Sequence, residues 1–298
     1  MPIKKRDFFP LFCAILCVLL FVFGLFTSFF AKSAASVYIA MTAYQVIIFI
    51  IPSFFYLKKR EIKFSDILPD GFFIIKNVGF TVCSLFLLIF GAILIKMGVF
   101  GAGWINFFPM YSSTVKISMS SVYDIILLIL VFALLPAITE EFIFRGIAFA
   151  EYKNAGVLPS ILISSTLFAF IHFDFALFFV YLFAGLIFAA VRYFTESLYT
   201  VIAIHFFYNC FALFVEPYIW SFLSRSERIA WFWVILFALF FLFLYLFLNH
   251  TQKIIAKKES ILYEKKGAEN ILISFMSPYF ISAAALFIIF TVIGLFIG

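Results

Sequence analysis

The sequence predicts an all-α protein, a polytopic transmembrane helical bundle of about 8 to 9 spans that forms a single integral membrane domain over residues 1–298. Two observations lead to this prediction. Hydrophobic residues make up 66% of the chain and charged residues only 12%, which is about half the charged fraction of a soluble domain. The apolar runs are also long enough for membrane-spanning helices, whereas a barrel would show alternating segments of about ten residues.

Nine apolar runs follow one another along the chain, separated by short polar or basic stretches. The first run is too long for a signal peptide and lacks a clear cleavage site, so it is predicted to be the first transmembrane helix. Lys76 and Lys96 lie near the ends of the third run, where their long side chains are expected to reach the membrane interface. Residues 101–120 are predicted to form an external loop and residues 216–228 a polar break. The predicted spans are 8–31, 36–57, 72–100, 122–152, 157–172, 175–193, 197–215, 229–249 and 271–297.

The basic residues predict the orientation of the bundle. Nine spans with the N-terminus in the cytoplasm put fourteen lysines and arginines inside and four outside, the asymmetry expected from the positive-inside rule. We therefore expect a multi-pass protein of the cell membrane with a cytoplasmic N-terminus. Topology also explains the net charge of +6, so membrane lipids and no nucleic acid are the expected partners, with the oligomeric state left open. The inside set is Lys4, Lys5, Arg6, Lys58, Lys59, Arg60, Lys63, Lys153, Arg192, Lys253, Lys257, Lys258, Lys265 and Lys266, and the outside set is Lys32, Lys116, Arg225 and Arg228.

The four cysteines, Cys13, Cys17, Cys83 and Cys210, all fall within apolar runs. Cysteine in such surroundings behaves as a small packing residue. We therefore predict neither a disulfide nor a cysteine metal site.

The fourth run contains two adjacent carboxylates and an arginine, at Glu140, Glu141 and Arg145. A charge inside a membrane span costs about 3 kcal/mol even on insertion scales, so such charges commonly serve a function. Despite Pro136, we predict one helix through this stretch. Glu141 and Arg145 would then share a face, with Glu140 about a quarter turn away. Arg145 can thus neutralise Glu141, which leaves Glu140 as a candidate general base or acid; a structural ion pair beside a leftover glutamate is the alternative.

Two of the three histidines lie inside apolar runs, His172 at the end of the fifth and His205 in the seventh. Asn209 follows His205 by four residues and shares its helical face. His250 is predicted to lie in a loop after the eighth run, and no role is assigned to it. One intramembrane histidine can be a packing residue. Two of them, with an asparagine and a glutamate pair on other helices, form a polar set that hydrocarbon penalises unless the groups meet in a site.

These residues form three ordered motifs, Glu-Glu-x-x-x-Arg at 140–145, Phe-x-x-x-His at 168–172 and His-x-x-x-Asn at 205–209, on three separate predicted helices. The set resembles the CAAX prenyl endopeptidase and bacteriocin-processing family of intramembrane proteases, also called the CPBP or Abi family. The resemblance covers about residues 122–215, which we treat as the motif-bearing catalytic core.

The resemblance implies a peptidase that forms no covalent intermediate. Glu140 would act as general base on a water molecule that His172 helps to hold. His205 and Asn209 would donate hydrogen bonds to the oxyanion of the tetrahedral intermediate. The adjacent glutamate–arginine pair would hold these groups in place. No serine or cysteine lies in the motifs as a candidate nucleophile.

A zinc ion is the alternative to this metal-free mechanism. Catalytic zinc uses three protein ligands and one open position, and Glu140, His172 and His205 would be those ligands. They are spread over three predicted helices, however, and no His-Glu-x-x-His pattern is present. We therefore expect no required cofactor and keep a zinc-dependent form of the same protease as the alternative.

The predicted function is an intramembrane endopeptidase that hydrolyses a peptide bond of a membrane-associated or prenylated, CAAX-type peptide or protein. A second hypothesis is a non-enzymatic protein for bacteriocin self-immunity, or a membrane scaffold, that keeps the polar cluster for binding. A third is a transporter or proton relay, which intramembrane carboxylates and histidines also serve. The chain lacks the repeated hydropathy pattern typical of such transporters.

Overall fold

The computed structural model describes residues 8–30, 33–68, 77–100, 121–152, 155–224, 229–257 and 266–297, and every regular element within these ranges is helical. This confirms the predicted all-α bundle. The predicted external loop at 101–120 and the predicted interfacial Lys76 both lie outside the described residues.

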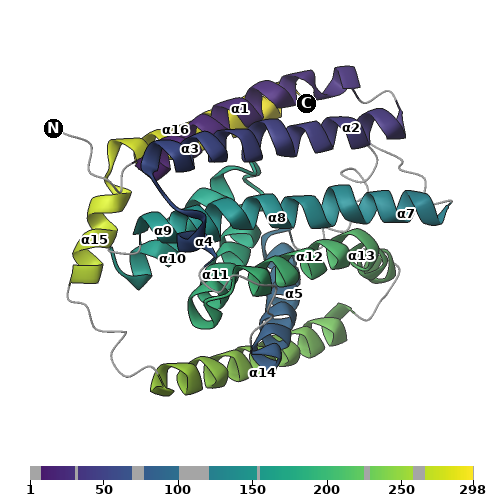
Figure 1. Cartoon of the computed structure of the whole chain (residues 1–298). Helices are drawn as coiled ribbons and strands as arrows, with labels where there is room; N and C mark the ends of the chain where they lie inside the picture. Colours follow the sequence, from purple (N-terminus) through teal and green to yellow (C-terminus); the bar gives the residue numbers. More distant parts are fainter. Residues whose placement is uncertain are drawn as a thin grey trace.

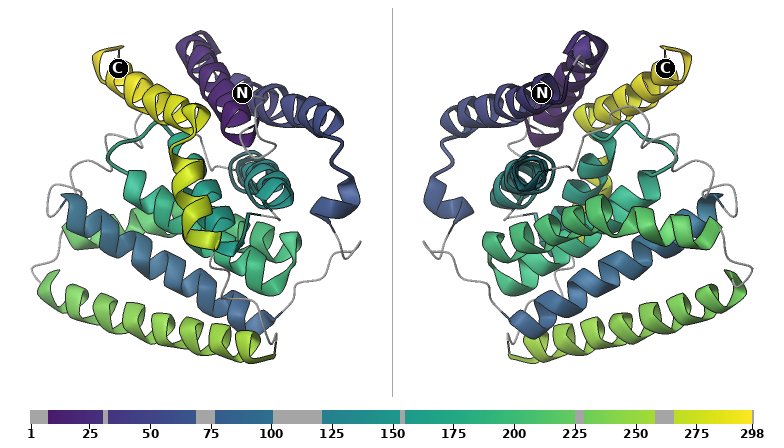
Figure 2. Two further views of the ribbon diagram at one scale, coloured as in Figure 1. Left: turned by 90° about the vertical axis from the view of Figure 1, so that its left-hand side faces the viewer. Right: turned by 90° about the vertical axis from the view of Figure 1, so that its right-hand side faces the viewer.

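Two groups of long helices form opposite sides of the molecule (Figures 1 and 2). On one side α1 packs against α16, and a second long helix runs beside them through α2, η2 and α3. On the other side α5 packs against α14. Their bounds are α1 Phe8–Phe30, α2 Ala34–Tyr44, η2 Gln45–Ile50, α3 Ile51–Arg60, α16 Pro278–Ile297, α5 Val78–Phe100 and α14 Ile229–Lys257.

The helices that carry the three motifs lie between these two sides (Figure 1). This central position surrounds the charged motif residues with protein rather than with lipid. One continuous helix contains α7 (Val122–Leu128), η4 (Ile129–Leu134), α8 (Leu135–Glu141), η5 (Phe142–Ile147) and α9 (Ala148–Tyr152). The others are α10 (Val157–Phe170), α11 (Phe178–Thr195), α12 (Leu198–Phe214) and α13 (Glu216–Ser224), with α4 (Phe64–Ile67) and α15 (Lys266–Phe275) beside them.

Each of the nine predicted spans corresponds to helix in the structure. Within the described residues, six helices are long and apolar enough to cross a membrane, or up to seven if the bent pair α12 and α13 is one span. The remaining two segments, Val157–Phe170 and Pro278–Gly294, are shorter apolar helices. The 14 residues of α10 reach about 21 Å, less than the hydrocarbon thickness of about 30 Å.

Two predicted helix boundaries are wrong. The ninth predicted span is broken by a turn at Met276 and Ser277, because Pro278 begins a new helix and the Ser277 hydroxyl accepts a hydrogen bond from Phe280 N at 3.3 Å. The eighth span continues about two turns further than predicted, to Lys257. His250 therefore lies inside α14 and not in a loop.

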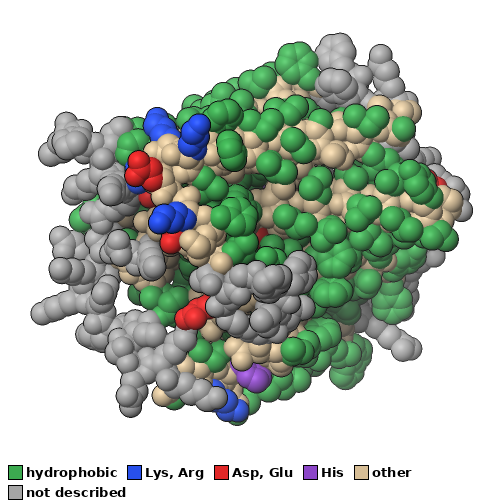
Figure 3. Space-filling view, in the orientation of Figure 1, with side chains coloured by type: hydrophobic (Ala, Val, Ile, Leu, Met, Phe, Trp, Pro, Cys, Tyr) green, Lys and Arg blue, Asp and Glu red, His purple; other side chains and the backbone are tan. Residues whose placement is uncertain are grey.

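The outer surface has the composition of a lipid-facing one. Large hydrophobic side chains are exposed on α1, α3, α5 and α14. In Figure 3 hydrophobic side chains cover much of the part of the face that is not grey, and most of the lysine, arginine and acidic side chains lie toward its left side. A soluble protein rarely exposes so continuous an apolar surface, so the chain is a multi-pass membrane protein.

Lys96 and Glu216 differ from the prediction. Lys96 was expected at the membrane interface and Glu216 at the start of a polar break, but both are buried and form an ion pair between α5 and α13. Trp220 Nε1 also donates to the Glu216 carboxylate at 3.0 Å. The prediction failed because the two charges are 120 residues apart in the chain, and pairing is what permits their burial.

Candidate active site

The helix with the two glutamates is continuous through its proline but contains two wide turns. Pro136 has no backbone N–H, and the π-turn η4 immediately before it accommodates the missing helical hydrogen bond without ending the helix. A second π-turn, η5, follows Glu141. Its Arg145 carbonyl accepts a hydrogen bond from Arg192 Nε of α11 at 3.1 Å. Glu140 and Glu141 therefore lie at the end of α8, between the two π-turns.

Glu141 and Arg145 form the predicted ion pair inside the bundle. Arg145 Nη1 donates to Glu141 Oε1 at 3.1 Å, and both side chains are 0% exposed. Arg145 Nη2 also donates to the Gly185 carbonyl at 2.9 Å. A side chain at Gly185 would meet Ser165 at about 3.0 Å, so the glycine allows the close approach of α11 and α10 that places this carbonyl.

Two phenylalanine rings enclose the arginine. The Arg145 guanidinium carbon lies 4.6 Å from the ring centre of Phe168 and 5.2 Å from that of Phe188. Both rings are buried, so the cation is held by aromatic faces as well as by its hydrogen bonds. Phe168, the first residue of the second motif, thus contacts the arginine of the first.

His172 lies in the turn immediately after α10, and its ring orientation is set by three contacts. Its Nδ1 is 2.8 Å from the Phe168 carbonyl, which can only accept, so Nδ1 carries the proton. The ring stacks on Tyr181 at 3.8 Å and meets the edge of Phe168 at 4.8 Å. In the neutral imidazole, Nε2 is therefore a hydrogen-bond acceptor.

His205 on α12 is held in the same way by the buried ion pair. Its Nδ1 lies 2.7 Å from Glu141 Oε1, the oxygen that also accepts from Arg145. Because that carboxylate is paired with the guanidinium, the histidine nitrogen is the donor. The ring stacks on Phe188 at 4.7 Å. Glu141 thus fixes the His205 tautomer, a contact that the residue spacing did not predict.

Two helices and the turn after α10 bring three side chains close to one point. Glu140 Oε2 lies 4.0 Å from Nε2 of His172 and 4.0 Å from Nε2 of His205. These distances are too long for direct hydrogen bonds. They match the span of two hydrogen bonds of about 2.8 Å that meet at a single water oxygen at roughly 90°. The arrangement is therefore suited to holding one water molecule against the Glu140 carboxylate.

Asn209 is placed differently. Its amide nitrogen donates to the Ala133 carbonyl in η4 at 3.2 Å. One of its two N–H groups is therefore used to hold α12 against the motif helix, two turns before Glu140. In the structure the side chains of Glu140, His172 and His205 lie close to one another. The Asn209 side chain instead contacts the backbone of η4, which belongs to the same continuous helix as Glu140.

The fit of a zinc ion can be judged from the same distances. Ligand atoms bound tetrahedrally at about 2.0–2.1 Å lie about 3.3 Å apart, which is shorter than the 4.0 Å found between Glu140 Oε2 and each Nε2. No group of three His, Cys, Asp or Glu side chains among the described residues is placed to hold a metal ion. In this arrangement, the three residues do not fit tetrahedral zinc.

Two side chains near the site were not among the predicted residues. Tyr181 covers one face of the His172 ring, and Gln45 contacts Thr139, the residue before Glu140. Gln45 could have been noticed as a polar residue within the second apolar run. Tyr181 carried no such signal, because tyrosine is common near membrane interfaces.

Comparison with known proteins agrees with the motifs. A family model described as Type II CAAX prenyl endopeptidase Rce1-like matches residues 122–211. The match confirms the predicted resemblance and assigns this segment to a family of proteases. It includes all three motifs, from Glu140 to Asn209. No curated protein and no solved structure matches the chain.

Proposed function

We propose that this chain, which matches a family model described as Type II CAAX prenyl endopeptidase Rce1-like over residues 122–211, is an intramembrane endopeptidase that cleaves a lipid-modified peptide with a glutamate-activated water molecule. It would act in the cell membrane, with its N-terminus in the cytoplasm. The observation that carries the proposal is the approach of Glu140 Oε2 to both histidine Nε2 atoms at 4.0 Å, inside an apolar bundle.

The number of hydrogen-bond donors and acceptors around the proposed water molecule suggests a different role for each histidine. Glu140 and both Nε2 atoms accept hydrogen bonds when the histidines are neutral, but one water molecule has two protons to donate. Glu140 and both Nε2 atoms can all form a hydrogen bond with the water if one of the three carries a proton and donates to the water oxygen. His205 is suited to that role, because its Nδ1 contacts the Glu141 carboxylate, which stabilises an imidazolium. Protonated His205 can then donate to the substrate oxyanion, and neutral His172 can accept from the water.

The proposed reaction proceeds in two steps. Glu140 takes a proton from the water, and the water oxygen forms a bond to the scissile carbonyl carbon. The resulting oxyanion is stabilised by His205, and by the remaining N–H of Asn209 if the substrate carbonyl reaches it. The C–N bond then breaks, and the proton held by Glu140 moves to the leaving amine. Low polarity around the site strengthens each of these electrostatic contacts.

An apolar groove beside the site supports a lipid-modified substrate. Its volume is about 820 Å³, within the range of ligand-binding pockets. It lies between η2 and α3 on one side and α8 and η5 on the other. Phe54, Ile50 and Ile138 on its rim are 65%, 46% and 42% exposed, so the groove opens on the outer surface of the bundle. A hydrocarbon chain can enter there from the bilayer.

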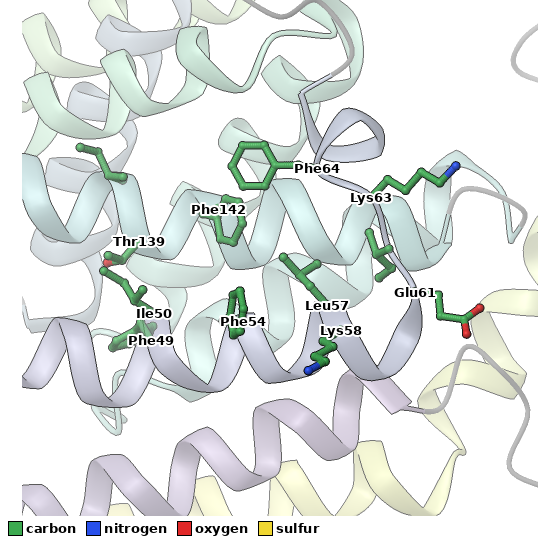
Figure 4. Close-up of a pocket in the computed structure, with 12 residues that line it drawn as sticks. Phe49, Ile50, Phe54, Leu57, Lys58, Glu61, Lys63, Phe64, Thr139 and Phe142 are labelled. Atoms are coloured by element: carbon green, nitrogen blue, oxygen red, sulfur yellow. The ribbon is translucent and has the colours of Figure 1, made fainter.

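The two ends of the groove differ in polarity (Figure 4). Thr139, Ile50 and Phe49 lie together at one end, and Lys63 and Glu61 lie at the other. Thr139 immediately precedes Glu140 in α8, so the first end of the groove lies close to the candidate site along the motif helix, although Glu140 is not one of the lining residues. A chain attached next to the scissile bond could therefore occupy the groove while the bond lies against Glu140.

The test is cleavage of a panel of internally quenched peptides by the purified full-length chain in lipid nanodiscs. Each peptide is supplied with and without a prenyl chain on the residue before the scissile bond. We expect cleavage of prenylated peptides, with kcat/KM at least about 10-fold higher than for the matched unmodified ones, since hydrocarbon burial contributes about 0.8 kcal/mol per CH₂. Binding of the peptides without cleavage of any would contradict the protease proposal and favour the scaffold hypothesis.

The metal-free mechanism has its own test. Dialysis against EDTA and 1,10-phenanthroline is expected to leave the cleavage rate within about 2-fold of the untreated rate, because the proposed water is activated by protein side chains and not by a metal ion. Elemental analysis of the same preparation should find zinc well below one equivalent per chain. Loss of activity that returns on addition of zinc would establish the zinc-dependent alternative.

A further inference from the structure

Gln45 is a primary amide buried in an apolar helix. It begins η2 in the second long helix and is 5% exposed. An amide removed from water costs roughly 1–3 kcal/mol on the scale of protein mutational data unless its hydrogen bonds are replaced. A glutamine buried to this extent is therefore expected to have a hydrogen-bonding partner for each end of its side chain.

Within the described residues, one end of this amide has a partner and the other has none. Thr139 Oγ1 donates to Gln45 Oε1 at 2.5 Å, which links η2 to α8. The structure records no hydrogen bond from Gln45 Nε2 to any described residue. If the amide is rotated by 180°, the nitrogen contacts Thr139 and the oxygen is left over. In either orientation one hydrogen-bonding group of Gln45 remains uncommitted.

Gln45 does not line the groove itself, but its hydrogen bond with Thr139 places it beside the inner end of the groove. Thr139, its partner, lines the inner end of the groove and precedes Glu140. Phe49, one helical turn after Gln45, lines the same end. Neither end of the Gln45 amide is among the fully buried side-chain atoms that lack a partner, so within the described residues its uncommitted end keeps some accessible surface while the other end contacts Thr139.

We propose that Gln45 binds the main chain of the substrate at a peptide unit adjacent to the scissile bond. This inference rests on the proposed protease function. A peptide that enters the bilayer brings unsatisfied N–H and C=O groups, each of which needs a partner in the protein. A glutamine amide has both a donor and an acceptor, so it can pair with a peptide unit whatever the substrate side chains are. Gln45 would therefore position the substrate without selecting for particular substrate side chains.

The competing interpretation is purely structural. The Gln45–Thr139 hydrogen bond could serve to join the second long helix to the motif helix and contact no substrate. The two interpretations differ in one respect. A structural link affects all peptides equally, whereas a main-chain contact is sensitive to a change at one backbone position.

The experiment is a double-mutant cycle between the protein and the peptide backbone. Peptides carry a non-hydrolysable isostere at the scissile bond, and in each one a single neighbouring amide is replaced by an ester. Binding to the full-length chain in nanodiscs is measured for the wild type, Gln45→Met and Thr139→Val. We expect one ester position to weaken binding to the wild type about 3- to 10-fold, as loss of one net hydrogen bond does, and to weaken binding to Gln45→Met less than 2-fold.

Thr139→Val is the matched control because it removes the link between the helices while Gln45 stays. The ester penalty should persist in Thr139→Val. An equal ester penalty in the wild type and in Gln45→Met would overturn the proposal. The absence of any position-specific ester penalty in the wild type would also overturn it, and this second outcome does not depend on the folding of a variant. Because binding is measured without turnover, a chain that cleaves no peptide but shows the coupling would retain this contact while losing the protease function.

Discussion

Replacing Glu140 with glutamine is expected to lower kcat for cleavage of a prenylated peptide by about 10²- to 10⁴-fold, with a much smaller change in KM. General-base catalysis typically contributes a factor of this size. Glutamine preserves the shape of the side chain but cannot take a proton from water, while both Nε2 atoms at 4.0 Å remain in place. Steady-state kinetics of the purified variant in nanodiscs measures the effect.

The matched control for this variant is Glu196→Gln. Glu196 is an exposed glutamate at the end of α11, and its replacement should leave kcat within about 2-fold of the wild type. Both variants should retain the wild-type circular dichroism spectrum and melting temperature to within a few degrees. If Glu140→Gln cleaves as fast as the control, Glu140 is not the general base.

Replacing Arg145 with methionine is expected to destabilise the fold by about 3–5 kcal/mol. The change removes the cation and leaves the Glu141 carboxylate buried, and breaking a buried ion pair from one side costs about this much. The arginine also loses its contacts with the Gly185 carbonyl and the Phe168 ring. Equilibrium unfolding by denaturant in mixed micelles, followed by circular dichroism, measures the loss.

A double variant separates the buried charge from the lost packing. Arg145→Met with Glu141→Gln removes both charges, so it should be destabilised by less than the sum of the two single changes, with a coupling of about 1–3 kcal/mol. Lys59→Met, an exposed lysine of α3, is the control and should change the unfolding free energy by less than about 0.5 kcal/mol. Strict additivity of the pair would mean that the two charges are not energetically linked.

The membrane class and most helix positions were readable from local patterns. Apolar run length predicted helix in all nine segments, and the four-residue spacing of Glu141 and Arg145 predicted their ion pair, found at 3.1 Å. The predictions were wrong where the local sequence pattern did not determine the structure. Pro278 divided one predicted span into two helices, and Lys96 found Glu216 on another helix instead of the membrane interface.

The sequence predicted which residues form the candidate site, but it did not predict most of the contacts between them. Glu140, His172 and His205 stood out because polar groups in apolar runs are costly. Their roles as catalytic residues remain a prediction for the kinetic experiments. The contact of His205 with Glu141, which sets its proton, joins residues 64 positions apart, and the contact of Asn209 with Ala133 joins residues 76 apart.

Hydropathy and helical periodicity are properties of neighbouring residues, so the chain alone was enough to establish a helical membrane protein, its motif residues and the pairing within one helix. The folded bundle decided which faces of different helices meet, because that depends on side-chain shapes matching across helix surfaces. Gly185 against Ser165 is an example, since their close approach brings the Gly185 carbonyl to Arg145. The same packing created the groove that ends at Thr139 and the burial of Gln45 beside it.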